Sequence, residues 1–361
     1  MMQSLFMDTN LNKTVFVGLS GGVDSSVAAA RLLAQGYNVV GVFIKVWHPD
    51  FMVCNWEQER LDAMRVAAHL GIPFLTCDAE DAYRADVADF FIEEYRQGRT
   101  PNPDVMCNQH VKFGRFLDFA ISKGADFIAT GHYAQRIEVA HAAEMHRGFD
   151  TGKDQTYFLW TLSQEQLNRT LFPVGDTPKE KIRQEAETLG IPVATKKDSQ
   201  GICFLGHVDI PEFLSHYIDL VPGDVLDRES NVVGTHKGAL VYTTGQRHGL
   251  TITNQDASRK PLFIIERDIE ANTLTVASEL ESVTETDTLE LSSAVLRTTI
   301  SEGDGLELQI RYRQTPIKAV VVSTDGEEIA LKPTEPMDKP APGQSCVLYR
   351  GSLCIGGGIL S

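Results

Sequence analysis

Lys13–Val27, KTVFVGLSGGVDSSV, is the segment of this 361-residue chain that indicates its fold class most clearly. Its first part, Val15–Leu19, is a short apolar run without helical periodicity, which is typical of a strand buried on both faces of a parallel sheet. Ser20-Gly21-Gly22 interrupts the run, and Val23–Tyr37 then has the residue spacing of a helix that Gly36 ends. A strand, a glycine-rich turn and a helix direct backbone N–H groups and a positive helix end to one point. The stretch therefore predicts an anion site, most naturally for phosphate.

The residues of the turn narrow the kind of phosphate site. The chain has no G-x-x-x-x-G-K-[ST] lysine, and no G-x-G-x-x-G follows the first strand. The turn instead offers the hydroxyls of Ser20, Ser25 and Ser26 together with Asp24. S-G-G-x-D-S resembles the pyrophosphate-binding loop of the ATP-pyrophosphatase (N-type) superfamily, whose members cleave ATP between the α- and β-phosphates. The alternative is an ordinary turn in which Ser or Asp caps a helix.

Length and composition indicate a globular protein of two or three domains. Hydrophobic residues make up 42% and charged residues 23%, and no run approaches the roughly 18 apolar residues of a membrane span. The first residues have neither a basic nor an apolar signal-peptide region, so we expect a cytoplasmic protein with no membrane partner. The net charge of −16 excludes nucleic-acid binding by bulk electrostatics, so any such partner must meet a local basic surface. One such group is Lys179, Lys181, Arg183, Lys196 and Lys197.

The six cysteines are spread over the chain and form no C-x-x-C pair. This distribution argues against a zinc site and against a disulfide scaffold, and favours free thiols. The cysteines are Cys54, Cys77, Cys107, Cys203, Cys346 and Cys354.

The first half of the chain alternates predicted strands with predicted helices. Such alternation, with short links, is typical of an α/β domain with a doubly wound parallel sheet. Ligands of these sheets bind beyond the carboxyl ends of the strands. The Ser20 loop and Gly131-His132, which follows the predicted strand Phe127–Thr130, are expected at that edge.

From Leu220 onwards the sequence consists of short β-type runs separated by turn residues. Asp325-Gly326 and Arg350-Gly351 have the composition of hairpin turns. We predict three domains: a catalytic domain over 1–215, a small central β-rich domain over 216–285 and a C-terminal β-barrel over 286–361.

Two of the six cysteines have sequence neighbours that are compatible with a reactive thiol. Cys107 follows a proline-rich loop and precedes the helix predicted over His110–Lys123, and a helix start favours the nucleophilic thiolate. Asp104 is close enough in the sequence to exchange a proton with it. Cys203 lies in a predicted strand beside the flexible Gly201. The alternative for each is a small buried apolar residue, which is the commonest fate of a free cysteine.

A longer set of motifs resembles bacterial tRNA-specific 2-thiouridylases of the MnmA type. The similarity runs in order from Val15 to Ile359 and includes both cysteine motifs, whereas other ATP-pyrophosphatases such as GMP synthetase share only the Ser20–Ser25 loop. The motifs are PNPDVMCN, GHY, GKDQTYFLW, LFPVG, KKDSQGICF, TTGQRHGL, RYRQT, GQSCVLY and GGGI.

The resemblance implies a role for each matching position. Cys107 would be the nucleophile, Cys203 the persulfide carrier and Asp104 a candidate acid/base, and the two cysteines would be able to form a disulfide. ATP would contact Gly18, Leu19, Ser20, Gly21, Gly22, Val23, Asp24, Ser25, Ile44 and Gly131. At Ile44 this chain departs from the methionine that is usual in the family. The target base would contact Asn102, Pro103 and Asp104, and the tRNA would contact Lys153, Asp154, Gln155, Arg311 and Tyr312.

The implied reaction is ATP-dependent tRNA thiolation. The substrate would be a tRNA with a wobble uridine, whose O2 is adenylated and then replaced by sulfur from a cysteine desulfurase or relay protein. Mg²⁺ would bridge the ATP phosphates. The rival functions are an amidoligase that uses the same loop and a non-catalytic tRNA-binding module.

The proposed tRNA contacts in LELQIRYRQ depend on strand alternation. If this segment is a strand, Arg311 and Arg313 share one face and Tyr312 points to the other. The alternative is a solvated barrel face without an RNA partner.

Overall fold

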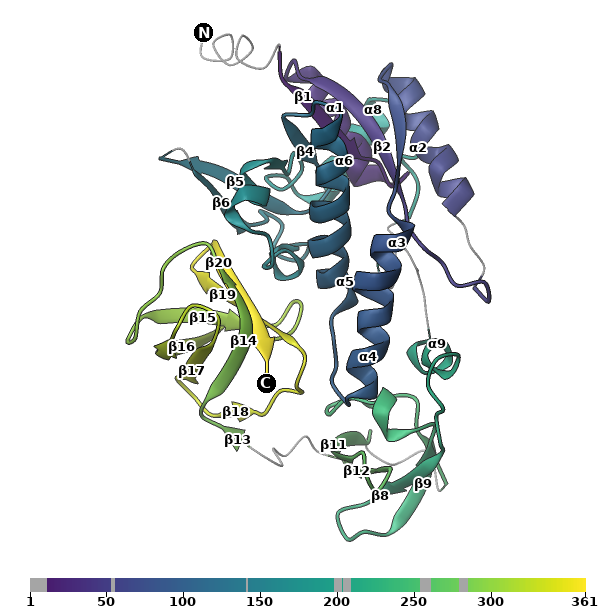
Figure 1. Cartoon of the computed structure of the whole chain (residues 1–361), viewed down its shortest axis with the longest axis vertical. Helices are drawn as coiled ribbons and strands as arrows, with labels where there is room; N and C mark the ends of the chain where they lie inside the picture. The colour runs from purple at the N-terminus through teal and green to yellow at the C-terminus, as the bar shows by residue number, and fades with distance from the viewer. Residues whose placement is uncertain are drawn as a thin grey trace.

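The computed structural model describes residues 12–52, 56–140, 142–197, 203, 209–253, 261–278 and 285–361. It has a parallel sheet at one end, a small β domain at the other and a β-barrel beside the helices that connect them (Figure 1).

The N-terminal sheet is parallel throughout, in the order β3-β2-β1-β4-β7. Its strands are β1 (Thr14–Gly18), β2 (Asn38–Lys45), β3 (Phe74–Asp78), β4 (Phe127–Ala129) and β7 (Thr170–Leu171). Successive side chains of a strand point to opposite faces, so Val15 and Val17 enter one core while Phe16 enters the other. Both faces are therefore covered, which confirms the predicted doubly wound α/β domain.

Two groups of helices cover the two faces. The first group packs on Val15 and Val17 and comprises α1 (Val23–Ala34), α2 (Trp56–Leu70) and α8 (Lys179–Thr188). The second group consists of two continuous helical rods, each with a π-helical middle. One rod comprises α3 (Glu80–Tyr83), η1 (Arg84–Asp89) and α4 (Phe90–Arg96). The other comprises α5 (Pro103–Met106), η2 (Cys107–Arg115) and α6 (Phe116–Ser122).

The central domain is a five-stranded sheet in the order β10-β9-β8-β12-β11. Its elements are α9 (Ile210–Ser215), β8 (Gly223–Leu226), β9 (Val232–His236), η4 (Ala239–Val241), β10 (Thr251–Ile252), β11 (Phe263–Asp268) and β12 (Thr273–Ala277). Phe91, Ile92 and Tyr95 of α4 are buried in the core of this domain. The first rod therefore belongs to two cores, one at each end.

The C-terminal strands close into a barrel of six strands, because β14 pairs with both β17 and β20. The barrel strands are β14 (Leu289–Leu296), β15 (Gly305–Gln309), β16 (Ile317–Thr324), β17 (Ile329–Pro333), β19 (Ser345–Arg350) and β20 (Leu353–Leu360). β13 (Glu285–Thr286) pairs with β18 (Met337–Asp338) beside it. The turns at Asp325-Gly326 and Arg350-Gly351 join antiparallel strands, so both hairpin predictions are confirmed.

A hairpin that the sequence analysis missed joins the first domain to the barrel. Its strands are β5 (Ala134–Val139) and β6 (Ala142–Arg147), and β6 extends the barrel sheet through the pair His146–Leu353. The connection that follows carries η3 (Thr156–Phe158) and α7 (Gln164–Asn168).

Arg297 of the barrel fastens this junction. Its guanidinium donates to the carbonyls of Trp160 (2.8 Å) and Leu162 (2.7 Å) in the first domain and to that of Cys354 (2.9 Å) in the barrel. Hydrogen bonds from a charged donor are among the stronger ones in proteins.

We expect Arg297→Leu to lower the free energy of unfolding by about 1–3 kcal/mol, because buried carbonyls lose their donor. Urea titration followed by circular dichroism measures the change. Lys332→Met, which removes an exposed cation from β17, is the matched control and should change stability by less than about 0.5 kcal/mol. Equal stability of the two variants would contradict the role given to Arg297.

Candidate active site

The loop between β1 and α1 is shaped by glycine and by its own hydroxyl groups. Gly21 has φ +70°, and a Cβ there would lie 2.6 Å from the carbonyl oxygen of Glu59 on α2, so only glycine fits. The Ser25 hydroxyl accepts from the backbone N–H of Ser20 at 3.3 Å, and the Ser26 hydroxyl donates to the Gly22 carbonyl at 2.7 Å. No side chain of the described residues caps the start of α1. The first N–H groups of this helix therefore remain directed at the loop.

Gly131 comes to the same point from the neighbouring strand β4. A Cβ on Gly131 would lie 2.6 Å from the Ser25 nitrogen and 2.8 Å from the carbonyl carbon of Asp24. The two segments that were expected at the carboxyl edge of the sheet are thus in van der Waals contact there.

Asp24 is the acidic residue around which the polar contacts at the carboxyl edge of the sheet are arranged. It accepts a hydrogen bond from the Tyr133 hydroxyl at 2.7 Å and forms an ion pair with Lys179 of α8, whose Nζ lies 2.7 Å from both carboxylate oxygens. Lys179 is buried. Sequence analysis grouped Lys179 only with a run of basic residues, and nothing in the sequence pairs it with Asp24, 155 residues away.

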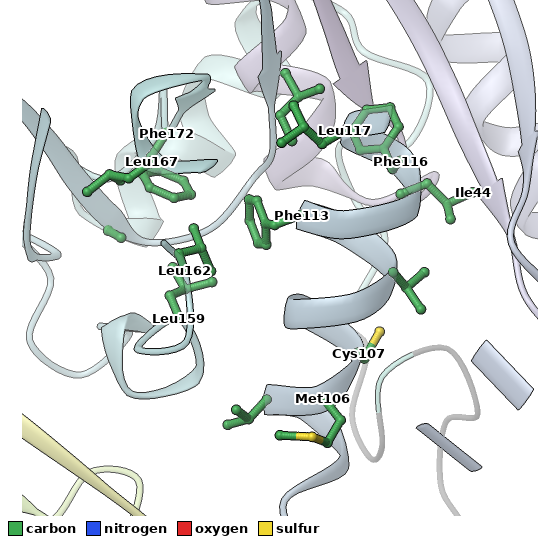
Figure 2. Close-up of a cluster of buried hydrophobic side chains, with 14 of the residues drawn as sticks. Ile44, Met106, Cys107, Phe113, Phe116, Leu117, Leu159, Leu162, Leu167 and Phe172 are labelled. Carbon is green, nitrogen blue, oxygen red and sulfur yellow. The ribbon is translucent and has the colours of Figure 1, made fainter. Parts of the chain in front are cut away.

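Ile44 lies at the end of β2, beside the end of β1. A Cβ on Gly18 would lie 3.7 Å from Ile44 Cδ1 and 3.5 Å from the Phe116 ring. Ile44 is buried in the core that also holds Cys107 and Phe116 (Figure 2). The edge of the parallel sheet beside the Ser20–Ser25 loop, here called the phosphate-type loop, is therefore apolar where Ile44 and Phe116 lie.

The second helical rod starts earlier than the sequence suggested. It begins at Pro103, and Asn102 caps it by accepting from the backbone N–H groups of Asp104 (3.1 Å) and Val105 (3.3 Å). Cys107 therefore lies one turn inside the helix and is fully buried, next to Met106 in the apolar cluster of Figure 2. The expectation that a helix start near His110 stabilises a thiolate at Cys107 is wrong. Burial instead raises the pKa of Cys107 well above its ordinary value.

Cys203 is held at this rod by its backbone. Its N–H donates to Asp104 Oδ1 at 2.8 Å, and its carbonyl accepts from the Tyr83 hydroxyl of α3 at 3.0 Å. The strand expected around Cys203 lies outside the described residues, apart from Cys203 itself. Burial raises the pKa of the Asp104 carboxyl, against the opposing effects of the Cys203 N–H and of Lys112.

The side chains of Cys107 and Cys203 share a hydrogen bond. This bond from Cys107, together with the charge of Lys112, outweighs burial and lowers the pKa of Cys203 to about 7. Cys107 is thus the S–H donor and Cys203 the more acidic thiol. Both are free thiols, as are Cys77, Cys346 and Cys354.

The residues expected to touch tRNA occupy different environments. Asp154 is engaged inside the protein, where it pairs with Arg147 at 3.1 Å and accepts from the Gly148 N–H at 2.9 Å. Gln155 accepts from the backbone N–H of Tyr133 at 2.9 Å, and Lys153 is only partly exposed.

The strand predicted through Arg311–Arg313 is absent from the described barrel. β15 ends at Gln309, and Arg313 has φ +62°, a left-handed conformation that a strand does not contain. Arg311 is exposed at this turn, whereas the Tyr312 ring packs 4.7 Å from that of Phe158. The expected alternation of side chains at these positions is therefore wrong, and Arg311 and Tyr312 are turn residues.

The described residues contain no group of three or more His, Cys, Asp or Glu side chains suited to a metal ion. Within the same part of the chain, none of the helices has the length and apolar character needed to cross a membrane.

Comparison with known proteins places this geometry in a family. Three family models match consecutive parts of the chain: a tRNA methyl transferase HUP domain over 13–207, a tRNA methyl transferase PRC-barrel domain over 211–278 and an aminomethyltransferase beta-barrel domain over 291–360. The tRNA-specific 2-thiouridylase MnmA of Streptococcus equi subsp. zooepidemicus (strain H70) is 43% identical over 98% of this chain and 96% of its own length. The chain belongs to the MnmA family.

Other curated members are similarly close to this chain. The MnmA proteins of Haemophilus ducreyi and Klebsiella pneumoniae are each 42% identical, and cover 97% and 96% of this chain and 93% and 96% of their own lengths. Among solved structures, a 4-thiouridine synthetase–RNA complex with bound ATP is 21% identical, covers 56% of this chain and 50% of that chain, and has a TM-score of 0.35.

Replacement of Asp104 tests the contact that holds Cys203. Asp104→Ala leaves the Cys203 N–H without its acceptor, and we expect a loss of about 1–3 kcal/mol in the free energy of unfolding, measured by urea titration. Asp104→Asn keeps an acceptor oxygen and should not show this loss. If the alanine variant were as stable as the asparagine variant, the hydrogen bond from Cys203 to Asp104 would not contribute to the free energy of unfolding.

Proposed function

We propose that this chain is an ATP-dependent tRNA sulfurtransferase that converts a wobble uridine to 2-thiouridine. The observation that carries the proposal is the short path between the phosphate-type loop and the thiol pair. Gly131 touches the loop, the next residue His132 lies 3.5 Å from Lys112 Nζ, and Lys112 forms a hydrogen bond to Cys203. A nucleotide at the loop and a sulfur at Cys203 would therefore act on one substrate atom between them.

The proposed reaction uses the loop first. The uridine O2 attacks the α-phosphorus of ATP, and pyrophosphate leaves into the Ser20–Ser25 loop, where the α1 N–H groups and Lys179 offset its charge. Mg²⁺ would neutralise phosphate charge beside this loop. Both oxygens of Asp24, the carboxylate of the loop, are engaged by Lys179, so Asp24 does not offer a ready ligand for the ion. Ile44 and the apolar edge beside it would contact the adenine.

Sulfur then replaces the adenylated oxygen. Two routes are open, and in both Cys107 first gives its proton to Asp104, the candidate acid/base. In one, Cys107 attacks the inner sulfur of a Cys203 persulfide, the freed sulfide attacks C2 of the base, and AMP leaves with the former O2. In the other, the terminal sulfur of the persulfide attacks C2, AMP leaves with the former O2, and Cys107 then attacks the Cys203 sulfur and releases the thiolated base. Both routes end in a Cys107–Cys203 disulfide, which a thiol reductant returns to two thiols. The sulfur donor would be a cysteine desulfurase or a relay protein.

Asn102, Pro103 and Asp104 would meet the target base at the start of the second rod, beside Cys203. Arg311, exposed at the end of β15, and Lys153 are the cations that would meet tRNA phosphates. The internal partners of Asp154 and Gln155 favour a role for these residues in shaping the 150–156 segment that presents Lys153.

Methyl transfer, which the matching family-model descriptions mention, is the second candidate. The hydrogen-bonded thiol pair with one acidified member favours sulfur transfer over it.

Nucleoside analysis tests the proposed reaction. We incubate the enzyme with ATP, unmodified tRNA, cysteine and a bacterial cysteine desulfurase, and expect 2-thiouridine and AMP. Cys203→Ser should make no 2-thiouridine while binding tRNA normally, and Cys346→Ala, which changes a buried thiol of the barrel, should keep its activity. Full activity of Cys203→Ser would remove the persulfide role, and formation of a methylated base only would favour the second candidate.

Gly131→Ala tests nucleotide binding at the sheet edge. The added methyl group meets backbone atoms of Asp24 and Ser25, so the loop must shift, and we expect the Kd for ATP to rise at least about tenfold by isothermal titration calorimetry. Gly305→Ala adds the same methyl group where no atom lies within 4 Å and should bind ATP like the parent protein. Equal affinities would place ATP elsewhere.

A further inference from the structure

Lys112 is a lysine in the site that the sequence analysis did not single out. It follows Cys107 by five residues on the same helix and is only partly exposed. Its ammonium lies 3.5 Å from His132 Nε2 and forms a hydrogen bond to the Cys203 side chain. A cation enclosed in this way requires a partner that compensates for its lost hydration.

The π-helical segment Cys107–Arg115 explains how Lys112 reaches the thiols. In an α-helix of 3.6 residues per turn, residues five apart differ in direction by about 140°, so Lys112 would point away from Cys107. A π-helix joins residues i and i+5 by its hydrogen bonds and brings them to the same side. The wider turn therefore places the ammonium and the Cys107 sulfur at one face of the helix.

His132 fixes the position of that ammonium. The imidazole is buried, and burial followed by the charge of Lys112 holds the pKa of His132 well below its ordinary value, so the ring is neutral. An ammonium only donates, so Nε2 accepts from Lys112, and Nδ1 carries the hydrogen that faces the Thr130 hydroxyl at 2.8 Å. The tautomer of His132 is thus set from both sides.

The electrostatic effects at Lys112 favour its charged form. Burial acts against the charge, but the sulfur of Cys203 and the carboxylate of Asp104 raise the pKa of Lys112. Around the Cys203 sulfur, the described groups that titrate or donate are Cys107, Lys112 and Asp104 from the second rod, Tyr83 from the first rod and, behind Lys112, His132.

We propose that Lys112 is a catalytic residue that holds the sulfur at Cys203 as an anion, and that His132 is the residue that positions its ammonium. The Cys203 proton leaves to water, Lys112 keeps its own three protons, and the same ammonium remains beside the sulfur when Cys203 carries a persulfide. This inference rests on the proposed sulfur chemistry, because it assigns the charge of the atom that would carry the sulfur.

Alkylation of Cys203 by iodoacetamide measures this charge directly, because only the thiolate reacts. The enzyme is labelled alone over a pH series, and peptide mass spectrometry gives the labelling rate at Cys203, which is partly exposed. We expect a midpoint near pH 7 for the wild-type protein. Lys112→Met should raise the midpoint by about 1–3 pH units and slow labelling at pH 7 by at least about fivefold.

Variants of His132 separate positioning from packing. His132→Leu removes the acceptor for Lys112 and should raise the midpoint, whereas His132→Gln restores an acceptor oxygen and should return it toward the wild-type value. Lys123→Met, which removes an exposed cation just after α6, is the matched control and should leave the midpoint unchanged.

A wild-type midpoint near the ordinary thiol value of about 8.5 would overturn the proposal without any variant. A folded Lys112→Met protein, verified by circular dichroism, with the wild-type midpoint would overturn it as well. The assay contains neither ATP nor tRNA, so it is independent of the proposed function. A raised midpoint in Lys112→Met, with no 2-thiouridine made by the wild-type protein, would support the role of Lys112 and refute the sulfurtransferase.

Discussion

The hydrogen bond from the Cys203 N–H to Asp104 is the contact on which the candidate site depends. Asp104 lies in the first turn of the second helical rod, and the same rod carries Cys107, Lys112 and, at the edge of the parallel sheet, Phe116. Because the rod is continuous, fixing Cys203 to its start also fixes Cys203 relative to the loop beyond β1. One helix thus sets the distance between the part of the site suited to phosphate and the part suited to sulfur.

Burial determines which groups of the site are charged. Cys107 is fully buried and keeps its proton, while Cys203 accepts a hydrogen bond from that thiol and lies beside an ammonium. The same principle operates at the sheet edge, where buried Lys179 is compensated by Asp24. In both places a lysine that is distant in the sequence neutralises an anion: Lys112 neutralises the Cys203 sulfur and Lys179 neutralises Asp24. Each charge therefore has its own partner, and the two ion pairs do not compete.

The sequence predicted those features that depend on local patterns. Apolar runs and glycine turns predicted the parallel sheet and the meeting of the Ser20 loop with Gly131, because strand direction determines which ends share an edge. Features that depend on backbone geometry within an element were missed. The π-helical turn that brings Lys112 to Cys107 has no recognisable sequence pattern, and the left-handed Arg313 ends a strand that the alternation of side chains had extended. Contacts between distant segments, such as Lys179 with Asp24, lie beyond any local pattern.

The first helical rod joins the central domain to Cys203. Phe91, Ile92 and Tyr95 near one end are core residues of the central domain, while Tyr83 near the other end holds the Cys203 carbonyl. A rotation of the central domain that preserves its core must carry this rod with it, and the rod in turn carries the hydroxyl group that holds Cys203. The central domain, which lies farthest from the parallel sheet, is therefore coupled to the position of Cys203 through the first rod. A molecule that binds the central domain and rotates it would move Cys203 without contacting the site.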